Sequence, residues 1–152
     1  MEANYTCDFA APCDVGGWMR LVKSVTDNFP GLVLEDYQRT LEKNIERRSA
    51  VCARNGDEIV GVLLFSLPQR TLSCMAVHPA HRKKGLATAM IRKMIESFPV
   101  DADIWVTTFR ADDPMGDAPR ALYQSLGFQA DELVEEFEYP CQKFVLRRGN
   151  RL

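Results

Sequence analysis

Apolar residues recur at helical spacing in several segments of the chain. The strongest case lies at 86–98, where apolar residues recur every three or four positions and polar residues occupy the opposite face. This pattern predicts an amphipathic helix that ends before Pro99. Weaker patterns predict helices over about 14–28 and 34–48, and a short helix within APRALYQSLGF that Gly127 closes as a left-handed cap.

Other segments show the spacing of strands. The run AVCARNGDEIVGVLLF (50–65) predicts a hairpin whose turn contains Asn55-Gly56, a dipeptide suited to the positive dihedral angles of a tight turn. The run TLSCMAV (71–77) carries apolar residues on both faces, which indicates a central strand covered on each side. Further strands are expected at 103–109, near 128–138 and at 142–148.

This order of elements predicts a mixed α/β fold with a single domain over residues 1–152. Helical crossovers between the strands from 71 to 134 require parallel neighbours, whereas the two hairpins require antiparallel pairs. With 152 residues, of which 46% are hydrophobic, the chain can bury one sizeable core and is too short for two domains of ordinary size.

Composition narrows the classes of protein further. The chain has no apolar run long enough for a membrane span, and MEANYTCDFA at its start lacks the pattern of a secretory signal. We therefore expect a cytoplasmic protein that does not contact membranes. Five cysteines without a C-x-x-C pair favour reduced, buried thiols over disulfides or a zinc site, so no bound metal is expected.

Charges are unevenly distributed, although the net charge is only −2. Cations gather at 82–84 and in a basic C-terminal tail at 148–152, whereas DELVEEFE (131–138) is acidic. A nucleic-acid-binding protein would use the basic segments. An isoelectric point near 5.7 is low for that class, and the chain carries no helix-turn-helix or RNP-type signature, so we expect no nucleic-acid partner.

The basic turn before the strongest helix is the most informative feature of the chain. In HPAHRKKGLA (78–87), three cations stand beside the positive end of the helix dipole, where they are unfavourable. Unpaired backbone N–H groups of a first helical turn bind anions, and Gly85 lacks a Cβ that would keep phosphate oxygens from the main chain. A phosphate-bearing ligand would make the cations favourable, and a solvated surface turn is the alternative. The Walker A and dinucleotide-binding motifs are both absent.

The same turn resembles a known family. The segment VHPAHRKKGLA (77–87) is similar to the acyl-CoA-binding signature of the GNAT superfamily of N-acetyltransferases, with Arg82, Gly85 and Ala87 at its constrained positions. The segment ALYQSLGF (121–128) is similar to the family's second motif. The resemblance covers about 71–134.

For the fold, the resemblance implies a GNAT-like domain. Its sheet is mixed but mostly antiparallel and twisted, with six or seven strands and about four helices on both faces. The strands near 71–77 and 103–109 are expected to splay apart.

For the ligands, the resemblance implies acetyl-CoA as acyl-donor cosubstrate and a primary amine of a small molecule or peptide as acceptor, with direct transfer between them. The pantetheine arm would lie in the splay against main-chain groups of the strand at 71–77. Amides at the start of the next helix would hold the pyrophosphate, and the cations would contact the 3′-phosphate. The residues expected to bind the cofactor are Met75, Ala76, Val77, Arg82, Lys83, Lys84, Gly85, Leu86, Ala87 and Thr88.

For catalysis, Tyr123 matches the family position whose phenol lies near the cofactor sulfur, where it would protonate the departing thiolate or stabilise it by a hydrogen bond. A core residue of an amphipathic helix is the alternative. The chain has Thr71, Leu72 and Ser73 where some relatives carry a glutamate base. The base therefore stays open, with a water relay to a carboxylate such as Glu135 as one alternative.

Two other residues bear on the comparison with the family. His78 titrates in the range of a general base, but we expect it to have a capping or structural role. Gly116 stands where many relatives carry an asparagine that contacts the cofactor, so this contact is in doubt.

Acceptor specificity in the family usually comes from the first two helices and the last hairpin. Trp18, Phe29, Tyr37 and the acidic run at 131–138 would suit a cationic amine, although aromatic residues on such helices are more often core. An alternative function is a non-catalytic acyl-CoA-binding or sensory module of the same fold. A homodimer through the last strands and an unpaired edge guarded by charges are both compatible with the sequence.

Overall fold

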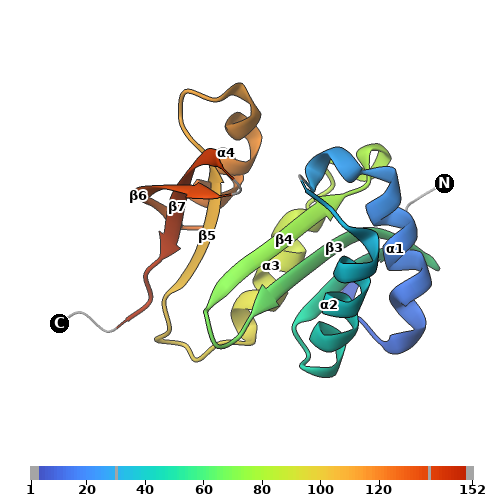
Figure 1. The fold of residues 1–152 in the computed structure, drawn as a ribbon. Coiled ribbons are helices and arrows are strands. Elements are labelled where there is room, and N and C mark those ends of the chain that lie inside the picture. The colour runs from blue at the N-terminus through green and yellow to red at the C-terminus, as the bar shows by residue number, and fades with distance from the viewer. Residues whose placement is uncertain (1–3, 30, 137, 150–152) are drawn as a thin grey trace.

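The computed structural model describes residues 4–29, 31–136 and 138–149 and shows one seven-stranded sheet in the order β1-β2-β3-β4-β5-β7-β6 (Figure 1). The strands are β1 (Tyr5–Phe9), β2 (Ala50–Asn55), β3 (Glu58–Ser66), β4 (Thr71–Val77), β5 (Ile104–Phe109), β6 (Gln129–Glu136) and β7 (Tyr139–Leu146). The α-helices are α1 (Val15–Ser24), α2 (Leu34–Glu46), α3 (Leu86–Glu96) and α4 (Asp117–Ser125). Short 3₁₀ helices are η1 (Pro12–Asp14), η2 (Thr26–Asn28), η3 (Pro79–His81) and η4 (Pro114–Gly116).

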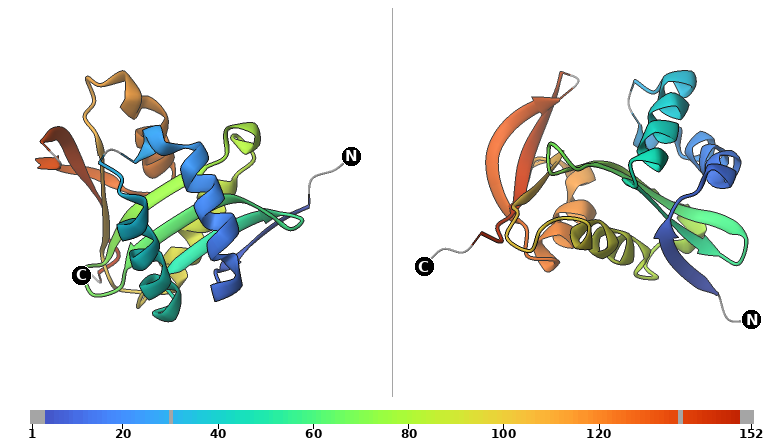
Figure 2. Two further views of the ribbon diagram at one scale, coloured as in Figure 1. Left: turned by 45° about the vertical axis from the view of Figure 1, so that its right-hand side comes forward. Right: turned by 90° about the horizontal axis from the view of Figure 1, so that it is seen from below.

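The helices cover both faces of the sheet and bury two apolar clusters against it. Helices α1 and α2 lie on one face, and α3 and α4 lie on the other (Figure 2). On the first face, Trp18 and Leu41 are fully buried against the sheet. On the second face, Met90 and Met94 of α3 are fully buried together with Phe65 of β3. Strand β3 contributes to both clusters, which is why its sequence is almost continuously apolar.

Most of the predicted elements are present. All four helices form, and Gly127 adopts φ = +95° immediately after the last of them, as expected of a left-handed cap. The first hairpin differs by one residue: Asn55 pairs with Glu58, so the turn consists of Gly56 and Asp57 rather than Asn55-Gly56. Gly56 has φ = +62°, which satisfies the need for a positive dihedral angle at the first turn position.

Two features of the sheet differ from the sequence-based predictions. Strand β1 was not expected, although its residues alternate between half-buried and exposed positions. The second helical crossover does not join neighbouring strands, because β7 lies between β5 and β6 and pairs antiparallel with both. The prediction of parallel neighbours is therefore wrong for β5 and β6, and it is correct for β4 and β5.

The parallel strands β4 and β5 meet at one end and diverge, as predicted. Their register contains one pair, Thr71 with Trp105, and the Trp105 N–H donates to the carbonyl of Arg70 (2.9 Å). Beyond this point the two strands separate and leave a gap in the middle of the sheet (Figure 1). The gap exposes main-chain groups of β4 that a continuous sheet would pair.

The five cysteines are free thiols. Cys52 is buried, but Cys13 is exposed, so the expectation of buried thiols is wrong for Cys13. Within the described ranges no group of three or more metal-ligating side chains occurs, and no described helix could cross a membrane.

The start of the basic tail is docked on the protein. The Arg148 guanidinium donates to the carbonyls of Ala102 (2.9 Å) and Pro99 (2.7 Å), and Arg147 pairs with Asp131 (2.7 Å). Residues 150–152 of that tail lie outside the described part of the chain. The two docked arginines are thus engaged with protein acceptors.

Candidate active site

The turn before α3 presents the start of that helix to solvent. Gly85 is the N-cap and has φ = +81°, and Lys83 has φ = +61°. The left-handed region costs little for glycine but about 1–2 kcal/mol for most other residues, so Lys83 holds a strained conformation here. The Ala89 N–H makes the first bond within the helix, to the carbonyl of Gly85 (3.0 Å). The three N–H groups between them therefore have no acceptor inside the helix.

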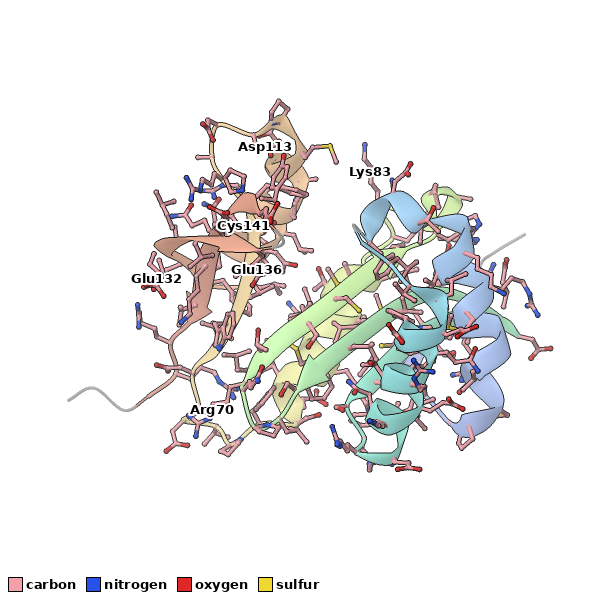
Figure 3. All side chains as sticks on the ribbon, viewed as in Figure 1. Arg70, Lys83, Asp113, Glu132, Glu136 and Cys141 are labelled. Carbon is pink, nitrogen blue, oxygen red and sulfur yellow. The ribbon has the colours of Figure 1, made fainter. Side chains whose placement is uncertain are left out.

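The cations of this turn are exposed and take part in none of the ion pairs found among the described residues. The Arg82 Nε–H donates to the carbonyl of Val77 (3.3 Å). Among the residues that the structure describes, the ammonium groups of Lys83 and Lys84 have no hydrogen-bond partner, and Lys83 projects beside the gap (Figure 3). An anion at the start of α3 would meet unpaired N–H groups and two unpaired ammonium groups.

Strand β1 holds the segment that leads into this turn. The Tyr5 hydroxyl lies 2.8 Å from Nδ1 of His81, and the two rings make an edge-to-face contact with centroids 5.7 Å apart. His81 also contacts the ring of His78 (5.4 Å), whose Nδ1 accepts a hydrogen bond from the Ala80 N–H (3.0 Å). His78 therefore caps the turn, in agreement with the sequence analysis.

Strand β4 directs alternate main-chain groups into the gap. The His78 N–H donates to the carbonyl of Val60 in β3 (2.8 Å). Because hydrogen-bonded positions alternate along an antiparallel pair, Ala76 also directs its N–H and C=O toward β3. Met75 and Val77 then direct theirs toward β5 and the gap. Of the three residues predicted to bind the pantetheine arm, these two offer main-chain groups and Ala76 does not.

Tyr123 lies in α4, which packs against β5 (Figure 1). Its side chain is 5% exposed and packs against the rings of Phe128 and Phe144, with centroids 5.7 and 6.3 Å away. Burial raises the pKa of the Tyr123 phenol to about 12. The phenol is therefore protonated at neutral pH and can donate a hydrogen bond.

Gly116 is buried, and a side chain at this position would force its neighbours to shift. A Cβ at this position would lie 3.0 Å from Cβ of Phe109 and 3.1 Å from the carbonyl oxygen of Arg110. The asparagine that many relatives carry here would therefore collide with β5 and the loop that follows it. The close packing of η4 on β5 explains this departure from the family pattern.

Strand β4 contains a bulge where it borders α2. The register pairs Leu64 with Cys74 and Phe65 with Leu72, so Ser73 is an extra residue without a partner. Ser73 is exposed and lines a cavity of about 450 Å³ between α2 and the turn from β3 to β4. The sequence analysis did not find this cavity, because it depends on how α2 packs on the sheet.

The aromatic residues proposed for the acceptor pocket belong mainly to the core. Trp18 is fully buried, and its indole N–H donates to the Tyr37 hydroxyl (2.9 Å). Phe29 is 9% exposed and contacts the ring of Tyr37, which is itself half-buried. These three residues therefore hold α1 and α2 together rather than line an open aromatic pocket.

Residues 131–136 of the acidic segment lie on the edge strand β6, on the far side of the gap from α2, and residue 137 lies outside the described part of the chain. Asp131 pairs with Arg147 (2.7 Å), and Glu132 lies 3.9 Å from the ammonium of Lys143. Glu136 lies toward the gap, near Cys141, and Asp113 lies opposite Lys83 across its upper end (Figure 3). This wall therefore carries both signs of charge, because the Arg110 guanidinium donates to the carbonyls of Cys141 (3.0 Å) and Val134 (3.0 Å) beside these carboxylates.

The candidate residues therefore fall into two groups. The turn at Arg82–Thr88 and the strand end at Met75–Val77 lie together at one side of the gap, and Tyr123 lies in α4 on its other side (Figure 1). The sequence analysis did not identify Tyr5. The alternation of apolar and polar residues in YTCDF could have placed it on a strand. No signal in the sequence connected Tyr5 with His81.

Comparisons with known proteins agree with this arrangement. Residues 46–130 match the model of the acetyltransferase (GNAT) domain. The sequence has no match among the curated proteins compared with it.

Solved structures extend the likeness to the whole described fold. Diaminobutyrate acetyltransferase EctA from Paenibacillus lautus, in complex with L-2,4-diaminobutyric acid and coenzyme A, is 18% identical with a TM-score of 0.77, covering 99% of each chain. The ribosomal-protein-S18-alanine N-acetyltransferase from Escherichia coli is 18% identical with a TM-score of 0.75, over 98% of this chain and 97% of the other. The putative acetyltransferase YncA from Salmonella typhimurium, with its cofactor acetyl-CoA, is 14% identical with a TM-score of 0.73, over 97% and 95%.

The family model covers more than half of the chain, and the solved acetyltransferases share its fold over nearly all of their length. The chain belongs to the GNAT acetyltransferase family.

Proposed function

We propose that this protein transfers the acetyl group of acetyl-CoA directly to a primary amine of a small molecule or peptide. The observation that carries the proposal is the unpaired, glycine-capped start of α3, which lies beside main-chain groups of β4 that face the gap. A diphosphate joined to an extended diamide fits that pair of features.

The phosphate end of the cofactor binds at the turn before α3. The N–H groups of Leu86, Ala87 and Thr88 point at the pyrophosphate, and Lys83 and Lys84 neutralise its charge and that of the 3′-phosphate. Arg82 keeps its bond to the carbonyl of Val77 and supports the end of β4.

The pantetheine arm extends along β4 toward the narrow end of the gap. Main-chain groups of Met75 and Val77 bond its two amides in the manner of an added strand. A main-chain N–H of β4 that the arm leaves unbonded donates to the thioester carbonyl as negative charge develops on that oxygen.

Acetyl transfer forms a carbon–nitrogen bond, breaks the carbon–sulfur bond and requires two proton transfers. The neutral amine nitrogen attacks the carbonyl carbon, the carbon–sulfur bond breaks, the nitrogen loses a proton and the thiolate gains one. Because the Tyr123 pKa of about 12 lies well above that of a thiol near 8.5, full proton transfer from the phenol to the thiolate is uphill. A hydrogen bond that stabilises the thiolate is therefore the main role we assign to Tyr123.

The proposal also covers the ligands, the cellular location and the partners. Acetyl-CoA is the cosubstrate, and L-2,4-diaminobutyric acid, which EctA binds, shows that the same fold accommodates a primary-amine acceptor in another chain. We propose a cytoplasmic enzyme without nucleic-acid, membrane or metal partners.

The test is an acetyl-CoA assay with a panel of primary amines that includes amino acids, polyamines and N-terminal peptides. We expect release of free CoA that depends on one class of amine, together with a product heavier by one acetyl group. Binding of acetyl-CoA without release by any amine would contradict the proposal. That result would favour the non-catalytic acyl-CoA-binding module. Ser73 at the bulge is compatible with that alternative, because a serine cannot serve as a carboxylate base.

A further inference from the structure

The cavity beside α2 borders the place where the proposed reaction occurs. Its walls come from the second half of α2, from the end of β3 and its turn, and from the bulged Ser73. Strands β4 and β5 pair only at Thr71 and Trp105, so the gap begins next to Ser73. A molecule that approaches the gap from the side of α2 therefore has this cavity beside it.

The cavity has an apolar floor. Leu64, Leu67 and Pro68 line it with apolar side chains, and Leu67 is 37% exposed. Phe65 contributes its main chain, because its ring is buried on the α3 face of the sheet. The cavity volume of about 450 Å³ lies within the range of pockets that hold small molecules. A short hydrocarbon chain would bury carbon surface here that is now in water.

Several polar groups around the cavity already have partners. The Asn44 amide donates to the carbonyls of Ser49 (3.4 Å) and Phe65 (3.2 Å). The Ser49 hydroxyl donates to the Asn44 carbonyl (3.3 Å), and the Ser66 hydroxyl accepts from the Gln69 N–H (3.3 Å). These groups hold the end of α2 on β3 and are not available to a ligand.

Arg47 is the single titratable side chain of the cavity wall. It is exposed, and the ion pairs found in the described part of the chain do not include it. It stands at the C-cap of α2, where its backbone N–H bonds the carbonyl of Lys43 (3.1 Å) and the side chain is left for another contact. A guanidinium at the rim of an apolar cavity matches a carboxylate at the end of a short carbon chain.

We propose that this cavity is the subsite for the far end of the acceptor, and that it takes a short aliphatic chain ending in a carboxylate that pairs with Arg47. The inference rests on the proposed function for the identity of the ligand as an amine acceptor. It narrows the acceptor class from any primary amine to amines that carry an anionic group several carbons away.

The first test uses ligands that cannot react, so that it does not depend on turnover. Hexanoate and hexanamide are titrated separately into the ¹⁵N-labelled protein while the backbone amide signals of Thr40, Leu67 and Ser73 are followed. We expect hexanoate to shift these signals and to bind at least about tenfold more tightly than hexanamide, the effect of one charge-assisted hydrogen bond. The Arg47→Gln variant should lose this preference.

The matched control is Arg39→Gln, an exposed arginine of the same helix that pairs with Asp36. It should leave hexanoate binding unchanged. Equal binding of the two probes to the wild type, or an unchanged preference in Arg47→Gln, overturns the inference whether or not the protein is an enzyme.

The second test compares two acceptors in the acetyl-CoA assay, 6-aminohexanoate and hexylamine. We expect kcat/KM to favour 6-aminohexanoate by about tenfold or more in the wild type and by a factor near one in Arg47→Gln, with hexylamine little affected. Turnover of both amines at equal rates contradicts the subsite but not the transferase. Specific hexanoate binding without turnover of any amine contradicts the transferase but not the anion site.

Discussion

Tyr123 is the residue whose environment bears most directly on the chemistry. Burial alone raises its pKa to about 12, so the phenol keeps its proton throughout the range in which the enzyme would be assayed. A tyrosine with an ordinary pKa would be half ionised near pH 10.

The Tyr123→Phe variant should lower kcat by about 10- to 100-fold, because the thiolate loses one hydrogen bond in the transition state. The dissociation constant for CoA, measured by calorimetry, should change by less than about twofold. As the pH is raised, kcat of the wild type should show no decline with an apparent pKa near 10. A decline centred near that value and absent from the variant would contradict the raised pKa.

Tyr5 tests whether β1 positions the phosphate-binding turn. Its hydroxyl reaches His81 one residue before the cationic segment. The Tyr5→Phe variant keeps the ring contact and removes the hydrogen bond, so KM for acetyl-CoA should rise about fivefold for a bond worth about 1 kcal/mol. With S-acetylpantetheine, which has no phosphates, the variant and the wild type should have equal kcat/KM.

Comparing the two acetyl donors distinguishes a role of Tyr5 in positioning the turn from a general destabilisation of the fold. Equal losses with acetyl-CoA and with S-acetylpantetheine would mean that Tyr5 supports the fold rather than the turn. Tyr139→Phe serves as the control, because this tyrosine donates to Asp113 (2.5 Å) on the other side of the gap.

At the scale of elements, the start of α3 combines a conformational and an electrostatic requirement. Gly85 needs its positive φ, yet a Cβ there would meet no atom within 4 Å. The cost of a side chain at this position is therefore conformational alone.

The Gly85→Ala variant should lose about 1–2 kcal/mol of unfolding free energy in urea titrations. It should also bind CoA more weakly, because the cap and the N–H groups move together. Gly16→Ala is the matched control: Gly16 lies in α1 with equally open space and no positive φ, so alanine should stabilise by about 0.5–1 kcal/mol. Stabilisation of both variants would show that the left-handed cap is not required.

Helix α4 and the turn before it differ from the family pattern for a packing reason. Restoring the family residue with Gly116→Asn should lower the unfolding free energy by about 1–3 kcal/mol, because Phe109 and the Arg110 carbonyl must shift. The affinity for CoA should not improve. A stable variant that binds CoA more tightly would show that η4 adapts and that the asparagine contact can be recovered.

The sequence predicted elements with long, regular patterns and missed those that depend on their neighbours. The period of α3 and the glycines at positions 85 and 127 were sufficient to place its limits and the end of α4. The five-residue strand β1 was too short to give a distinct pattern, and its pairing with β2 is a long-range contact. Strand β7 lies between β5 and β6 because the β6–β7 hairpin places its second strand against β5. No local pattern in the sequence encodes this arrangement.

The candidate site shows the same division. The cationic turn, Gly85 and Tyr123 could be found by motif, because their chemistry is concentrated in short segments. The unpaired groups of Met75 and Val77, the bulge at Ser73 and the cavity at Arg47 arise from register and packing. Regular alternation would have placed Ser73 on the face of Met75, and the bulge breaks that alternation.

At the scale of the whole molecule, the sheet consists of two parts joined at one end. Strands β1 to β4 form one part and β5 to β7 the other, with Thr71 and Trp105 as the junction. The cofactor would fill the gap between the parts and contact both. On the outer edge, the carboxylates of β6 discourage pairing with another strand.

The most direct measurement of the central claim is a titration of acetyl-CoA into the ¹⁵N-labelled protein, followed by backbone amide chemical shifts. The account predicts saturable shifts at Gly85 to Thr88 and at Met75 and Val77, with β1 and β2 little affected. Saturation without shifts at the start of α3, or no shifts at millimolar acetyl-CoA, would contradict it.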